Sequence, residues 1–260
     1  MTQDLTEILE QWPYDPEHTM RIIVAADGRS VLQVRLPLGL EQYELEGRPD
    51  GARPYGKPTV VDAIKAQREQ YVGTNGTDDG FVIQHDDCVA LQNEGVLFYY
   101  RYLMLFQLND FARVARDTEH NLALCGLLEK YCDNDEDRDA VLQFKPYIVR
   151  MNATARAMER IRSDAQSEAE QILIGAIEQI ESMPEVDSPA FQFEKVRSLT
   201  YLRSAIDQIE HHDSTNPVEI LRQELDEAVR EENYERAAEL RDRIRAMSAG
   251  DAEHSADDEY

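Results

Sequence analysis

The chain has 260 residues, of which 52 are acidic and 27 basic, and its formal net charge is −25. This length is enough for one large domain or two small ones, each with a sizeable core. A protein that binds a phosphate backbone needs clustered Lys and Arg to displace counterions, so the charge balance disfavours direct nucleic-acid binding.

Cysteine usage and the N-terminus indicate the compartment. Cys88, Cys125 and Cys132 are too few and too scattered for a disulfide framework, and they suit a reducing cytoplasm. The first seven residues are acidic and polar, so no signal peptide is expected. The most apolar stretch, residues 96–108, is too short to span a bilayer and contains Arg101. We therefore expect a cytoplasmic protein with no membrane contact.

The first part of the chain predicts a small antiparallel sheet. Three stretches are apolar or alternate in hydrophobicity: residues 20–25, 31–36 and 40–46. The dipeptide Asp27-Gly28 between the first two is a strong signal for a hairpin turn. A short helix is expected before the sheet, over residues 1–11, and a further short strand over residues 81–84.

Helices are predicted over most of the remaining chain. Thr59, with Asp62 three residues later, is typical of a helix start, and this helix should end near residue 72. From about residue 86 the pattern is helical almost to the end. Residues 97–106 are apolar or aromatic around nearly the whole circumference, which predicts a helix buried between layers. The alternative, stacking of nucleic-acid bases on these aromatics, is disfavoured because Lys and Arg are not interleaved with them.

Two further helical segments precede the C-terminal region. Residues 139–182 predict one long or once-broken helix, and a second helix runs from the break at residues 183–189 to about residue 210. The second helix carries a stripe of near-heptad spacing: Phe193, Val196, Leu199, Leu202, Ile206 and Ile209. We expect it to pair with the preceding helix as an antiparallel arm. Residues 211–216 are predicted to be a polar linker.

The C-terminal region has two amphipathic halves. In the first, one helical stripe is formed by Leu221, Leu225, Ala228 and Val229. In the second, another stripe is formed by Tyr234, Ala237, Ala238, Arg241 and Ile244, with Leu240 beside it. Asn233 lies between the halves and tolerates the left-handed conformation that ends a helix, while Pro217 suits the first helical turn. The pattern predicts a hairpin of two short helices.

This hairpin closely resembles the UVR motif, which is named after the UvrB and UvrC subunits of bacterial nucleotide-excision repair. The resemblance rests on the two stripes and on the core YERAAELRDRI, and it covers only residues 217–247. In the families that carry it, including Clp-type unfoldases and McsA-like adaptors, the hairpin is a protein–protein contact module. The resemblance therefore implies a partner protein, or a second copy of this chain, and not a reaction. The alternative is a solvated, charged hairpin that packs on its own domain and binds nothing.

One acidic segment has the spacing of a calcium loop. Asp133, Asp135 and Asp137 follow the D-x-D-x-D pattern, but Arg138 and Phe144 occupy the positions where such a loop needs Gly and a bidentate Glu. We expect this segment to cap the next helix.

Other residues with metal-binding or catalytic chemistry are isolated in the sequence. The segment His85-Asp86-Asp87-Cys88 has no second cluster at ligand spacing, so we expect a helix start with Asp caps. Cys-x-x-Cys pairs, a phosphate-binding glycine loop, a nucleophile elbow and a dinucleotide fingerprint do not occur in the sequence. Nothing in these patterns argues for catalysis or for a cofactor.

Together these patterns predict an α+β fold in four parts. They are an α+β region (1–95), a helical region (96–212), the UVR-like hairpin (217–247) and an acidic, disordered tail (248–260). The expected function is that of a non-enzymatic adaptor, accessory to bacterial DNA repair or Clp-type proteolysis. The alternatives are a structural or self-assembling helical protein and an enzyme whose site lies in the N-terminal α+β region.

Overall fold

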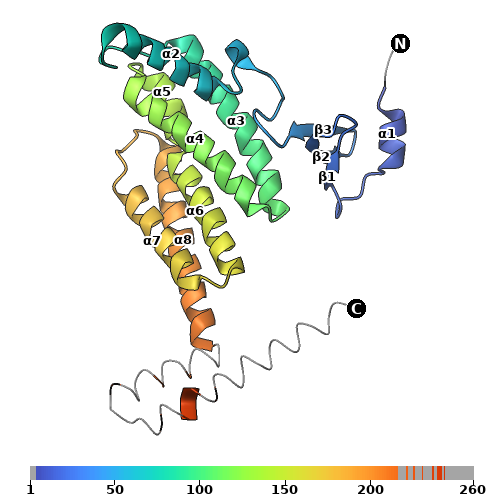
Figure 1. Ribbon diagram of the computed structural model, residues 1–260, viewed down its shortest axis with the longest axis vertical. Helices are drawn as coiled ribbons and strands as arrows, with labels where there is room; N and C mark the ends of the chain where they lie inside the picture. Colours follow the sequence, from blue (N-terminus) through green and yellow to red (C-terminus); the bar gives the residue numbers. More distant parts are fainter. Residues whose placement is uncertain are drawn as a thin grey trace. The chain divides into compact units, whose positions relative to one another are not determined.

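The computed structural model describes residues 4–215 and, beyond them, residues 221, 225, 230, 236, 239–241 and 243. The chain divides into two compact units, Met1–Leu202 and Arg203–Tyr260. The fold is α+β, as predicted: a small antiparallel sheet is followed by a mostly helical body (Figure 1). The predicted division at residue 95 falls inside a helix of the first unit.

The sheet has three strands in the order β1-β2-β3, with both pairs antiparallel. Their bounds are Met20–Val24 for β1, Ser30–Leu36 for β2 and Gly39–Glu44 for β3, and helix α1 (Thr6–Gln11) precedes them. In the turn between β1 and β2, Gly28 has a φ of 86°, a conformation that favours glycine. The central strand buries Leu32 and Val34, which join the core beneath the sheet.

The helical body packs around α4. The helices are α2 (Val60–Asn75), α3 (His85–Gln107), α4 (Phe111–Tyr131), α5 (Asp135–Leu142), α6 (Lys145–Arg162), α7 (Gln166–Glu181) and α8 (Pro189–Thr215), and a short 3-10 helix (Pro54–Gly56) precedes α2. Helix α4 lies between α3 and α6, and α7 packs against α6 (Figure 1).

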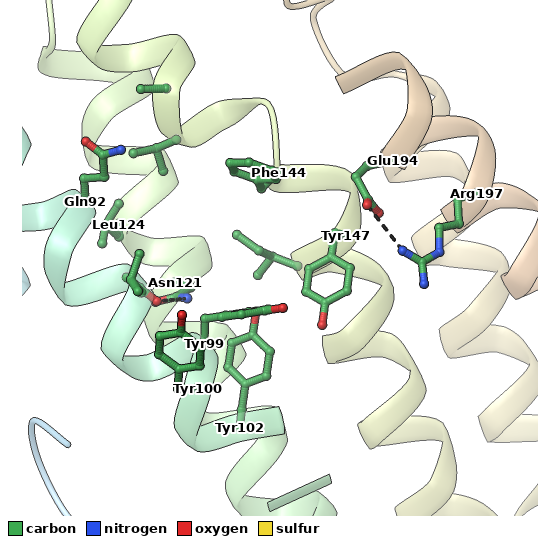
Figure 2. A pocket seen from close by; sticks show the side chains of 15 residues that line it. Gln92, Tyr99, Tyr100, Tyr102, Asn121, Leu124, Phe144, Tyr147, Glu194 and Arg197 are labelled. Atoms are coloured by element: carbon green, nitrogen blue, oxygen red, sulfur yellow. Dashed lines mark hydrogen bonds and ion pairs between the residues drawn. The ribbon is translucent and has the colours of Figure 1, made fainter. Parts of the chain in front are cut away.

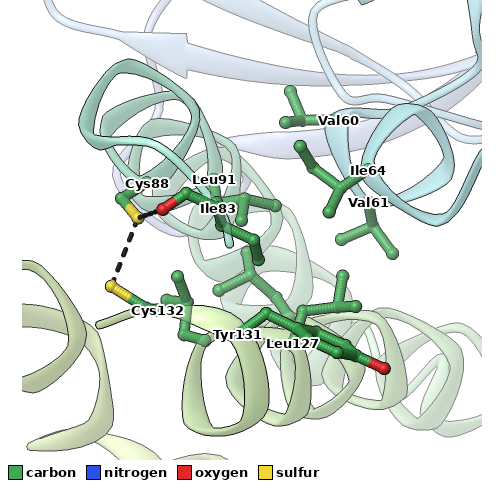
Figure 3. Close-up of a cluster of buried hydrophobic side chains, with 11 residues drawn as sticks. Val60, Val61, Ile64, Ile83, Cys88, Leu91, Leu127, Tyr131 and Cys132 are labelled. Atoms are coloured by element: carbon green, nitrogen blue, oxygen red, sulfur yellow. Dashed lines mark hydrogen bonds between the residues drawn. The ribbon is translucent and has the colours of Figure 1, made fainter. Parts of the chain in front are cut away.

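The first unit has two buried clusters. One joins α2, α3 and α4 (Figure 3) and consists of Val60, Val61, Ile64, Ile83, Cys88, Leu91, Leu124, Leu127, Leu128, Tyr131 and Cys132. The other joins the sheet to α3, α4 and α6 and consists of Leu32, Val34, Tyr43, Leu45, Tyr102, Leu105, Phe111, Val114, Met151 and Ala155. Helices α3 and α4 contribute to both clusters, so they connect the sheet to α2.

The predicted start of α2 is confirmed in detail. The hydroxyl of Thr59 accepts a hydrogen bond from the backbone N–H of Asp62 at 3.0 Å and donates to the Asp62 carboxylate at 2.9 Å. The helix continues three residues beyond the expected end, because Gly76 takes a left-handed φ of 83° and closes it there.

The two acidic segments are helix starts, as expected; the first caps its helix as predicted, whereas the second does not begin with the predicted Asp cap. At α5 the cap is Asn134, whose Oδ1 accepts from the N–H of Asp137 at 3.0 Å. Helix α3 begins with His85, and Asp86 and Asp87 lie in its first turn; the residue before it, Gln84, makes no side-chain cap. Both carboxylates still favour the positive N-terminal end of the helix dipole.

Two predicted boundaries were wrong. Residues 81–84 do not form a strand; instead the N–H of Ile83 donates to the carbonyl of Tyr131 at the end of α4, at 2.9 Å. Residues 139–182, predicted as one long or once-broken helix, are broken twice, between α5 and α6 and between α6 and α7; at the second break Asp164 has a φ of 58°. Apolar periodicity did not reveal these turns because it continues on either side of them.

The predicted linker over residues 211–216 was also wrong as far as Thr215, since α8 extends to that residue. No Gly or Pro interrupts the sequence between residues 190 and 215, so the polar residues at its end continue the helix. The near-heptad stripe of α8 does not form the expected seam either. Of the predicted stripe, Leu202 is fully buried, whereas Phe193 and Val196 are 62 % and 66 % exposed; the buried residue at the start of the helix is Phe191, which was not in the stripe.

Candidate functional site

A cleft of about 420 Å³ opens in the first unit beside α3 (Figure 2). Helix α3 supplies Tyr99, Tyr100 and Tyr102, and α6 supplies Tyr147 across the cleft, with Phe144 just before it. Tyr99 and Tyr100 are 36 % and 48 % exposed. The prediction that residues 97–106 are buried on all sides was therefore wrong for one face of this helix.

The polar groups of the cleft are few. Asn121 of α4 donates from Nδ2 to the carbonyl of Gly95 at 3.0 Å, and Glu194 and Arg197 of α8 form an ion pair at 3.5 Å at the other side. Burial raises the pKa of Tyr147 to about 12, so its phenol is neutral at physiological pH. The cleft is thus an aromatic surface with two amides, those of Gln92 and Asn121, and one carboxylate that is paired with Arg197.

The most buried carboxylate near the cleft has a structural role. Glu94 is fully buried and accepts hydrogen bonds from the N–H groups of Val60 and Val61, at 2.7 and 3.1 Å, at the start of α2. His120 approaches the same carboxylate at 3.1 Å through Nε2, and its ring stacks on Phe98. Because backbone donors and a histidine occupy both oxygens, this carboxylate serves to hold α2 on α3 and α4.

Metal-binding chemistry is not assembled in the described part of the chain. No group of three or more His, Cys, Asp or Glu side chains is placed there to hold a metal ion. His85 instead pairs with Asp137 at 2.8 Å, and this hydrogen bond raises the pKa of His85. The pair connects the start of α3 to α5.

The C-terminal stripes are described at a few positions. Leu221 and Leu240 are buried against each other, and Leu225 packs on them while remaining partly exposed. Arg241 is exposed. The other predicted interaction residues, Ala228, Val229, Tyr234, Ala237, Ala238 and Ile244, lie outside the described residues.

Leu221 and Leu240 come from the two predicted halves and share one buried cluster, and a family comparison identifies the segment. Residues 216–249 match the UvrB/UvrC motif. The prediction of a UVR motif is confirmed, and the rest of the chain has no recognised family. No curated protein and no solved structure matches the chain. The UVR motif is a module of protein interaction or of DNA repair, and this chain carries one.

The prediction from the sequence left one buried residue of the UVR motif outside its stripe, and it did not include the cleft. Leu240 was placed beside the second stripe, yet it is fully buried against Leu221. Its position three residues after Ala237 and four before Ile244 is the helical spacing that could have placed it on the buried face. For the cleft the only signal was the density of tyrosines over residues 99–102.

The helices of the described residues were compared with the needs of a membrane span. None of them combines the length and the apolar character that crossing a bilayer requires.

Proposed function

We propose that this protein is an adaptor that binds another protein, or a second copy of itself, through its UVR motif. The observation that carries the proposal is the match of residues 216–249 to the UvrB/UvrC motif. The buried contact between Leu221 and Leu240 supports it, because the two halves then present a common apolar seam. A process in which UVR motifs act, bacterial DNA repair or Clp-type proteolysis, is the setting that we propose for this adaptor.

The physics of short helices explains why the motif needs a partner. Isolated helices of about 12–15 residues are marginal in water and gain most of their stability from packing an apolar face. Leu225 remains partly exposed next to the buried pair of leucines, so apolar surface is left for a partner to cover. A second hairpin would cover it by completing a four-helix bundle.

We also propose that the protein acts by binding and not by catalysis. Two carboxylates that a buried site could have used are engaged in structural contacts: Glu94 holds the start of α2, and Asp117 is paired with Arg101. Strongly perturbed acids in a cleft are the usual mark of an acid–base site, and Glu194 in the cleft is paired with Arg197. The net charge of −25 supports a protein partner over a nucleic acid.

The test measures association of the full-length protein by sedimentation velocity, alone and with purified UvrB, UvrC or a Clp-type unfoldase. Leu225→Ala removes buried area and Ala238→Glu places a charge in the predicted seam, so each should weaken association by about 1–3 kcal/mol. The matched control is Glu239→Gln, because the exposed ion pair of Glu239 with Arg236, at 3.4 Å, should contribute little.

Self-association alone would mean that the motif binds a second copy of this chain, and association with one of the three proteins would mean that it binds a different protein. If Leu225→Ala and Ala238→Glu associate as the wild type does, the motif is not the contact surface and the proposal is wrong.

A further inference from the structure

The aromatic cleft beside α3 leaves apolar surface open in a concave site. Val96 and Phe144 on its rim are nearly half exposed, as is Tyr100. Single exposed apolar residues are common on convex surfaces, but several gathered in one hollow indicate a binding site. The volume of about 420 Å³ lies within the range of about 300–1,000 Å³ that is usual for small-molecule sites.

Two residues that line the cleft each have a buried side-chain oxygen without a hydrogen-bond partner. Within the described residues, Oδ1 of Asn121 and Oε2 of Glu194 have no partner. Asn121 is only 5 % exposed, and its Nδ2 is already engaged with the carbonyl of Gly95. Because a buried acceptor without a donor costs free energy, both atoms favour a ligand that brings an N–H or O–H group.

The charges around the cleft favour a neutral ligand. Glu194 and Arg197 neutralise one another at 3.5 Å, so a charged ligand would lose hydration at this wall without meeting an unpaired countercharge. A second guanidinium, that of Arg150, lies over the ring of Tyr147 at 5.0 Å and adds positive charge behind this wall. A neutral molecule avoids this loss of hydration.

The rings of the cleft favour a flat aromatic ligand. Tyr99 makes edge contacts with Tyr102 and with Tyr147, at centroid distances of 5.6 and 5.9 Å (Figure 2). The tyrosines therefore present both faces and edges to the cleft. Aromatic rings pack favourably in these orientations at centroid distances of about 4.5–7 Å.

We propose that this cleft binds a neutral, flat aromatic small molecule that donates an N–H or O–H hydrogen bond to Asn121 or Glu194. The ring packs among the tyrosines of α3 and α6, and the donor satisfies one of the two unpaired oxygens. This site belongs to the first unit and is independent of the UVR motif, so it can exist whether or not the proposed adaptor function is correct.

The test measures the affinity of the full-length protein for four probes by isothermal titration calorimetry. All four probes share one ring system. Indole is neutral and has a donor, N-methylindole lacks the donor, indoleacetate is an anion and tryptamine is a cation. We expect indole to bind most tightly and N-methylindole to bind about 3–10-fold more weakly, the usual effect of one hydrogen bond. Equal affinities for indole and N-methylindole, tighter binding of either charged probe, or no heat of binding from any probe would overturn the proposal.

Substitutions at the rim of the cleft test whether indole binds there. Tyr100→Ala and Phe144→Ala remove half-exposed rings from the rim, so circular dichroism should show an intact fold while the affinity for indole falls about tenfold. The matched control is Phe193→Ala, because Phe193 is an exposed aromatic residue of α8 that does not line the cleft. If Phe193→Ala weakens binding as much as Tyr100→Ala, or if neither rim variant weakens it, indole is not in the cleft and the proposal fails.

Discussion

Asp117 holds Arg101 through two hydrogen bonds of 2.6 and 2.7 Å, and both side chains are fully buried. The same guanidinium donates through Nη1 to the carbonyls of Glu44 and Gly47, at 2.7 and 2.8 Å. The pair therefore joins α3 to α4 and fastens the end of β3 to both helices. A buried charge pair of this kind is satisfied by hydrogen bonds on both sides, which is the condition under which it is tolerated.

Removing one member of this pair should destabilise the fold strongly. Asp117→Asn leaves the guanidinium of Arg101 buried without its countercharge, and we expect a loss of about 3–5 kcal/mol in the free energy of unfolding. Chemical denaturation followed by circular dichroism measures it. The matched control is Asp135→Asn, since Asp135 pairs with Arg138 at an exposed position and should contribute less than about 1 kcal/mol. A loss for Asp117→Asn no larger than that of the control would contradict the structural role of the pair.

The sequence predicted the fold class and most elements, but not this pair. Arg101 was visible as the charge within the apolar run, whereas Asp117 could not be distinguished from the other acids of a chain that has 52. Which buried charges pair depends on how the helices pack against one another. The spacing of residues within a single helix carries no information about that packing. For the same reason, the apolar character of α3 did not tell which of its faces stays open.

In the C-terminal region, by contrast, the prediction from the sequence was confirmed. There the UVR motif was predicted because its signal is local: short helical spacing, a turn residue and a specific run of letters lie within one segment. In α8 the prediction held for Leu202 and failed at the start of the helix, where Phe191 is buried and Phe193 and Val196 are exposed.

Buried thiols should make the protein sensitive to alkaline pH. Burial raises the pKa of Cys125 from an ordinary 9.0 to about 12, and burial together with the contact to Cys132 raises that of Cys88 to about 12. These groups contribute fully to stability below about pH 9. As the pH rises further, the unfolded chain loses the thiol protons that the folded state retains, so the free energy of unfolding falls.

Denaturation midpoints at about pH 8 and about pH 10 test this dependence. Buried tyrosines add to the alkaline loss in every variant, so the informative comparison is Cys125→Ala against wild type. We expect the decrease between the two pH values to be smaller in Cys125→Ala because one of the titrating groups is gone. An identical decrease would show that the thiol of Cys125 does not contribute.

The pair of His85 and Asp137 should be visible in a histidine titration. The hydrogen bond and the charge of Asp137 raise the pKa of His85 above its ordinary 6.5. The stabilisation is fully present below about pH 6.5 and is lost as the pH rises through the higher pKa of the folded state. An NMR titration of the His85 ring should show a decrease in pKa in Asp137→Asn. Asp86→Asn, which removes a weaker influence on the same ring, should produce a smaller decrease, and the reverse order would contradict the pairing.

The buried leucine contact should decide whether the UVR motif is folded at all. Leu240 is fully buried against Leu221, and replacing a buried leucine with alanine usually costs about 2–5 kcal/mol. Two short helices hold little more stability than that, so we expect Leu240→Ala to melt the hairpin while the first unit stays folded.

Hydrogen exchange followed by mass spectrometry reports both regions in one experiment. In Leu240→Ala, amides of residues 217–247 should exchange faster than in the wild type, and amides of α3 should keep their protection. Glu239→Ala is the matched control, because the side chain of Glu239 is exposed and its ion pair with Arg236 contributes little. Unchanged exchange over residues 217–247 in Leu240→Ala would mean that the contact with Leu221 does not hold the two halves together. Association through a preformed hairpin would then lose its physical basis.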